Sequence, residues 1–172
     1  MSPSGTPWKT RREIPDAQVR DAADQFDDAR RLLLSQPPGT GVLLPLLNNA
    51  AVALELYLKC LGAVLVYTPV SGSPGLSLVT AKPEAKKHKL VNLLDAMPGD
   101  VRADLEARYL AECPGRLLRE DLACYEGLFE TSRYVFEKTQ PLDPYQLSGV
   151  MELCDFLRSY VSALTPMERI EW

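Results

Sequence analysis

The feature that most constrains the fold is an apolar stretch from Val42 to Tyr67, long enough to form one helix through the centre of a domain. Its length would also suit a membrane span. However, two asparagines and the charged residues Glu55 and Lys59 interrupt it, and a charge near the middle of a membrane helix costs about 2.5–3.5 kcal/mol. We therefore predict no membrane association, and a core helix running from Leu43 to about Val66.

Apolar residues also recur at helical spacing over most of the remaining chain. Pro37-Pro38-Gly39, Pro98-Gly99 and Pro114-Gly115 break this pattern into segments. The pattern predicts further helices at Asp16–Leu34, at His88–Met97, from Asp100 to Pro114, from Arg116 onward, and at Pro144–Leu164.

Two of these helices carry well-defined apolar stripes. The first helix places Val19, Ala23, Phe26, Arg30 and Leu33 on one face. The last helix has a seam at 3.5-residue spacing that predicts packing on another helix or on another subunit, formed by Leu147, Met151, Cys154, Leu157, Val161 and Leu164.

The fold class expected from these patterns is all-α, an up-and-down helical bundle of five to six helices. Two short β-branched runs around a Ser/Gly/Pro turn predict a small β-hairpin or an ordered loop near residues 64–80. We expect residues 1–14 to form a flexible N-terminal arm and residues 15–172 to form a single domain, because no linker or internal repeat divides them.

Charge and cysteine usage exclude several functional classes. The chain has 19 Lys and Arg against 23 Asp and Glu, and its net charge of −4 gives no overall attraction to a phosphate backbone. Its four cysteines lie far apart, and there is one histidine, so we expect no zinc site, no disulfide framework and no cofactor. No apolar run follows the first arginines, which argues against a secretory signal and favours a cytoplasmic protein.

Glu55 and Lys59 lie four residues apart in the predicted core helix and should be partly buried. One hypothesis joins them in a polar cluster with Arg133, Tyr134 and Glu137. The alternative is an ordinary surface pair worth a few tenths of a kcal/mol.

His88 is the side chain best suited to proton transfer near neutral pH, and a neighbouring Arg133 would stabilise charge on a phosphate. It therefore joins the candidate cluster. The alternative is a structural histidine that hydrogen-bonds a nearby carboxylate or backbone group.

A basic run could contact a phosphate or an acidic partner; it consists of Lys82, Lys86, Lys87 and Lys89. Such runs are usually solvated loops, and no aromatic residues are interleaved as single-stranded nucleic-acid binding would favour.

Three segments carry a family resemblance. They read NNAAVALELYLKCLG from Asn48, KKHKLVNLLDAMP from Lys86 and YEGLFETSRYVFE from Tyr125. Together they resemble the HEPN superfamily over roughly residues 40–165. This superfamily comprises small helical bundles of prokaryotic toxin–antitoxin and defence systems, associated with RNA or nucleotides. The resemblance implies a homodimer, with RNA, a nucleotide or a partner protein such as a toxin, nuclease or transferase.

The RNase members of that superfamily have an Arg followed by four to six residues and a His, which act at a dimer interface without a metal. Before His88, the corresponding positions hold Ala81, Lys82 and Pro83, so Lys82 is the nearest substitute. Lysine lacks the planar fork with which arginine grips a phosphate. The resemblance therefore favours a non-catalytic module that dimerises or docks a partner through its terminal helix and its core helix. The alternative is a metal-independent endoribonuclease with a diverged site around His88, Arg133 and Tyr134.

Overall fold

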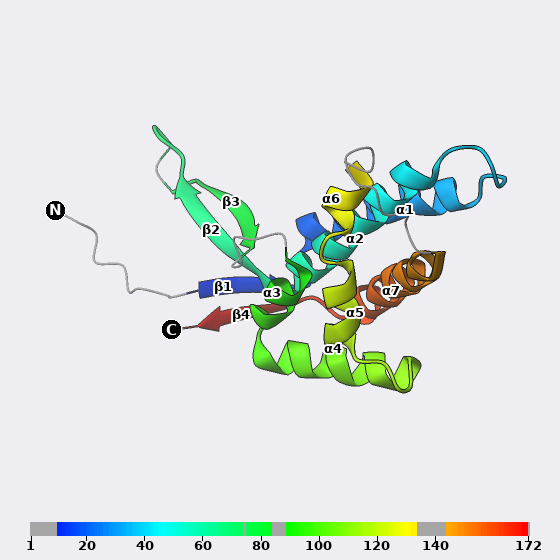
Figure 1. Ribbon diagram of the computed structural model, residues 1–172. Helices are drawn as coiled ribbons and strands as arrows, with labels where there is room; N and C mark the ends of the chain where they lie inside the picture. Colours follow the sequence, from blue (N-terminus) through cyan, green and yellow to red (C-terminus); the bar gives the residue numbers. More distant parts are fainter. Residues whose placement is uncertain (1–9, 74, 84–88, 134–143, 172) are drawn as a thin grey trace.

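The computed structural model describes residues 10–73, 75–83, 89–133 and 144–171 of the chain. These residues are mostly helical, with two small antiparallel sheets (Figure 1). In chain order the elements are β1 (Thr10–Ile14), α1 (Ala17–Leu34), α2 (Leu43–Gly62), β2 (Ala63–Pro69), β3 (Ser77–Pro83), α3 (Leu90–Asp95), α4 (Gly99–Glu112), α5 (Leu118–Tyr125), α6 (Leu128–Arg133), α7 (Pro144–Ala163) and β4 (Met167–Glu171).

Helix α2 is the central element, as its apolar composition predicts. It packs against α1, α3, α6 and α7. Ala50, Ala53, Leu54 and Leu58 are fully buried on it, and the two alanines leave room for neighbouring helices to approach closely. None of the helices in the described ranges is both long and apolar enough to span a membrane.

Helix α1 begins where the sequence predicts, because the side chain of Asp16 caps it by accepting a 2.9 Å hydrogen bond from the backbone N–H of Val19. The predicted stripe is wrong at one position. Phe26 is 38% exposed, whereas its neighbour Asp27 is fully buried. Arg30 is buried as predicted, and the two charges are buried together because they form an ion pair.

The seam of α7 packs on α2 within the same chain. Cys154, Leu157 and Val161 are fully buried, and Cys154 Sγ lies 3.6 Å from the carbonyl oxygen of Ala50 on α2. Of the two predicted uses of this seam, the structure shows packing on another helix. The seam and the buried residues of α2 from Leu46 onward are therefore occupied inside one chain.

The hairpin expected near residues 64–80 is present as β2 and β3, with Val66 opposite Thr80. Helix α2 ends at Gly62, four residues before the predicted end near Val66. The reason is local: Val64, Val66 and Tyr67 favour extended backbone and pair with β3. Figure 1 shows this hairpin projecting from the helices.

The second sheet adds to the expected, mostly helical fold, and it includes residues 10–14, which the sequence assigned to the N-terminal arm. Residues 10–14 form β1, which pairs antiparallel with β4. Ile14 is 1% exposed, and Arg12 Nη1 donates a 2.9 Å hydrogen bond to the carbonyl oxygen of Gly62. Local periodicity could not predict this sheet, because its strands lie at opposite ends of the chain.

Candidate functional site

The Glu55–Lys59 pair lies on α2, and its two side chains form an ion pair across one helical turn. Their side chains are 12% and 17% exposed, respectively. The pair is therefore neither a free surface pair nor fully enclosed, which agrees with the partial burial expected from the sequence.

Helix α6 packs on α2 and ends at Arg133, so the backbone of this third candidate lies on an element adjacent to the one carrying the pair. Nearby Ser132 is buried and donates to the carbonyl oxygen of Phe129 at 3.1 Å. The side chain of Arg133 and the residues His88, Tyr134 and Glu137 lie outside what the structure describes. The structure therefore joins Glu55 to Lys59, and the rest of the candidate cluster stays a prediction.

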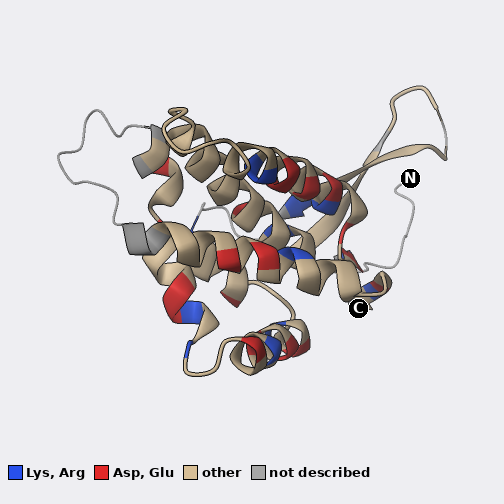
Figure 2. Ribbon diagram, turned by 90° about the vertical axis from the view of Figure 1, so that its right-hand side faces the viewer, with Lys and Arg blue, Asp and Glu red and all other residues tan. Residues whose placement is uncertain are grey.

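Two of the four candidate phosphate-contacting lysines are described. Lys82 is exposed on β3, and Lys89 is exposed directly before α3. Lys86 and Lys87 lie outside the described residues. Figure 2 shows acidic and basic residues interspersed along the helices rather than separated by sign.

A network of charges between α1 and α7, with the buried pair of Asp27 and Arg30 at its centre, was missed by the sequence analysis. Asp27 Oδ1 accepts a 2.6 Å hydrogen bond from Arg30 Nε, and its Oδ2 accepts 2.8 Å bonds from Arg31 and Arg158. Arg30 Nη2 also donates to Asp155 at 2.6 Å. The signal was available in the sequence, because an arginine within an apolar stripe needs a buried partner, and Asp27 lies three residues before it.

Burial alone would raise the pKa of Asp27, but the hydrogen bonds from Arg30, Arg158 and Arg31 outweigh it and hold the pKa below its usual value. In the same region, burial and a 2.7 Å hydrogen bond to Asp24 raise the pKa of Tyr57. These groups stay in one protonation state near neutral pH. They join α1 to its neighbours and are poorly suited to proton transfer.

Burial also raises the pKa of the Cys60 and Cys154 thiols well above neutral pH, which makes both poor nucleophiles. Within the described ranges, no group of three or more His, Cys, Asp or Glu side chains is placed to hold a metal ion.

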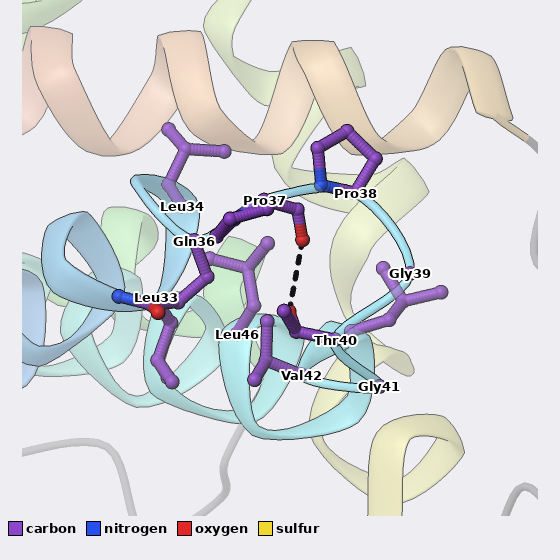
Figure 3. A pocket seen from close by; sticks show the side chains of 11 residues that line it. Leu33, Leu34, Gln36, Pro37, Pro38, Gly39, Thr40, Gly41, Val42 and Leu46 are labelled. Atoms are coloured by element: carbon purple, nitrogen blue, oxygen red, sulfur yellow. Dashed lines mark hydrogen bonds between the residues drawn. The ribbon is translucent and has the colours of Figure 1, made fainter.

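An apolar cavity of about 380 Å³ lies where α1 ends and α2 begins; we call it the α1–α2 pocket (Figure 3). Its lining carries no charged residue and includes Leu33, Leu34, Val42 and Leu46. The loop between the helices is held by a 3.0 Å hydrogen bond from the Thr40 hydroxyl to the carbonyl oxygen of Pro37. This geometry offers an apolar contact surface rather than a reaction centre.

No family model, curated protein or solved structure matches this chain.

Proposed function

We propose that this protein is a non-catalytic, HEPN-like binding and dimerisation module of a prokaryotic defence or toxin–antitoxin system. In this proposal its helices have the up-and-down bundle arrangement of that superfamily, and the module acts in the cytoplasm with RNA, a nucleotide or a partner protein. The observation that carries the binding role is the exposed apolar surface at the end of α1 and the start of α2.

That surface combines exposed leucine side chains with a pocket lining that carries no charged residue. Leu32 is 68% exposed, Leu34 49% and Leu43 43%, and the last two line the α1–α2 pocket. Contiguous exposed apolar residues of this kind are typical of interaction sites. Because the seams of α2 and α7 are buried within the chain, this surface replaces them as the proposed interface of a homodimer.

The chemistry of the described residues favours binding over catalysis. The buried tyrosine and cysteine side chains discussed above have raised pKa values, and Arg30, Arg31 and Arg158 are all held in ion pairs. None of these arginines is placed to clasp a phosphate without giving up a carboxylate partner.

The role is tested by incubating the purified full chain with mixed RNA in EDTA, beside a His88→Ala variant. The expected result is intact RNA in both reactions. Cleavage that survives chelation and disappears in the variant would establish the alternative, a metal-independent endoribonuclease around His88 and Arg133.

RNA binding is tested separately by fluorescence anisotropy with a labelled single strand. If the basic run contacts phosphate, the double variant Lys82→Ala/Lys89→Ala weakens binding and lowers its salt dependence. Arg102→Ala/Arg119→Ala is the matched control for the loss of two positive charges, since both residues lie outside the basic run and pair with Asp95. If the test variant and the control lose the same amount of RNA affinity, the RNA contact is not specific to the basic run.

A further inference from the structure

A second cavity, of about 270 Å³, lies where β1, β4, α4 and α7 meet; we call it the terminal pocket. Its floor is apolar and well packed. Ile14 is 1% exposed and Val101 8%, and Leu164 lies beside them in the lining. The volume lies below the roughly 300–1,000 Å³ of sites for drug-sized ligands, so an occupant must be small.

The rim of the terminal pocket carries charges of both signs. Arg169 forms two hydrogen bonds to Asp100, of 2.7 and 2.6 Å, which join β4 to the start of α4. Arg108 and Asp104, one turn apart on α4, also line the pocket. Two guanidinium groups and two carboxylates give the rim a formal charge of zero.

The two ion pairs differ in strength. Arg108 Nε lies 3.4 Å from Asp104 Oδ1 and 3.2 Å from Oδ2, which is long for a charge-assisted bond. Arg108 is oriented instead by the ring of Tyr160, whose centroid is 5.3 Å from the guanidinium carbon. The Tyr160 hydroxyl donates to Asp104 Oδ2 at 2.9 Å and fixes that carboxylate. A loosely paired cation and anion are thus held side by side above an apolar floor.

This arrangement selects against simple ions. An anion would meet Asp100 and Asp104, and a cation would meet Arg108 and Arg169, so a ligand carrying only one charge faces repulsion from half of the rim. A small molecule with adjacent positive and negative groups would satisfy both partners of the loose pair. An apolar side chain on that molecule would cover the floor.

We propose that the terminal pocket binds a free hydrophobic α-amino acid. Its carboxylate pairs with Arg108, its ammonium group pairs with Asp104, and its side chain lies against Ile14, Val101 and Leu164. The Arg169–Asp100 pair stays intact and closes one side of the pocket. This proposal is independent of RNA binding and of dimerisation.

The test is calorimetric titration of the full chain with L-leucine, beside three comparators that each lack one feature. 4-Methylpentanoate lacks the ammonium group, 3-methylbutylamine lacks the carboxylate, and glycine lacks the side chain. We expect saturable binding of leucine and binding at least about tenfold weaker for each comparator. A lost charged hydrogen bond has an effect of that size, and so does the lost burial of a leucine side chain. Methyl NMR shifts at Ile14 and Leu164 locate the ligand.

Arg108→Gln and Asp104→Asn should each weaken leucine binding at least about tenfold. Arg102→Gln, on the same helix but paired with Asp95 outside the pocket, should leave it unchanged. Circular dichroism confirms that each variant is folded, and two single variants keep the test valid if one is not. No saturable binding at millimolar leucine, equal binding of all four compounds, or binding unaffected by both variants would overturn the proposal.

Discussion

At the scale of single residues, Gly149 on α7 lies against a side chain that an added methyl group would meet. A Cβ atom built there would lie 2.2 Å from the Tyr125 hydroxyl oxygen and 3.4 Å from its Cζ. Tyr125 is 8% exposed, so its ring has little room to move. Gly→Ala inside a helix normally stabilises by about 1 kcal/mol. Here we expect Gly149→Ala to destabilise by about 1–3 kcal/mol in urea unfolding, because overpacking dominates.

Two variants separate this clash from a general effect of alanine. Tyr125→Phe removes the oxygen, so Gly149→Ala should cost much less in that background. Gly99→Ala, at the start of α4 with no atom within 4 Å of the new Cβ, should be close to neutral. A stabilising Gly149→Ala in the wild-type background would contradict the packing described.

We expect Asp27 to contribute to the acid sensitivity of the fold. Its side chain is fully buried and bonded to three arginines, so Asp27→Asn should cost about 3 kcal/mol of unfolding free energy at pH 7. The folded-state pKa lies below the unfolded value of about 3.9. The carboxylate therefore stabilises fully above that value, and its contribution is lost as the pH falls through the folded pKa.

The measurement is the difference in unfolding free energy between wild type and Asp27→Asn as a function of pH. It should be constant from pH 7 to about pH 5 and narrow below about pH 4. Asp21→Asn is the control, because Asp21 is 66% exposed and lies 3.6 Å from Arg20. If the difference in unfolding free energy between wild type and Asp27→Asn stays constant below about pH 4, the negative charge of Asp27 does not stabilise the fold.

At the scale of elements, the sequence predicted what local periodicity can encode. α2 and α7 lie within the predicted ranges because their apolar residues repeat at helical spacing, and the β2–β3 hairpin follows from β-branched residues around a Gly/Pro turn. The pairing of β1 with β4 joins residues 10–14 to 167–171 and has no local signal. Similarly, Glu55 and Lys59 were predicted as a partly buried pair from one helix. The Asp27–Arg30 pair has a comparable local signal within α1, whereas the partners Asp155 and Arg158 on α7 needed the tertiary structure.

The internal packing of the α7 seam makes a prediction about stability and mass together. Leu157→Ala should lower the unfolding free energy by about 2–5 kcal/mol, because Leu157 is fully buried. Since the seam faces α2 in the same chain, Leu157→Ala should leave the oligomeric state unchanged. Light scattering should therefore give the same molecular mass as for wild type. Ser162→Ala, at an exposed position on α7, should change neither quantity. Loss of the oligomer with unchanged stability would place the seam between subunits instead.

At the scale of the whole molecule, helices α1, α3, α6 and α7 pack on α2, and an uncharged surface remains exposed at the α1–α2 pocket. Two charged networks, Asp27 with its arginines and Arg169 with Asp100, fasten α1 to α7 and β4 to α4. The exposed apolar surface is thus separate from the charged network that fastens α1, which allows binding there without rearranging the fold. The separation of the exposed apolar surface from the charged network supports the proposal that the protein is a binding and dimerisation module.

Sedimentation equilibrium of wild type and Leu43→Asp tests that claim most directly. Leu43 is 43% exposed and lines the α1–α2 pocket, so a carboxylate there should disrupt a dimer without unfolding the chain. The control is Leu110→Asp, at a 48% exposed position on α4. We predict a dimer for wild type and the control, and a monomer for Leu43→Asp with unchanged helical content. A monomeric wild type, or a dimer that Leu43→Asp leaves intact, would contradict it.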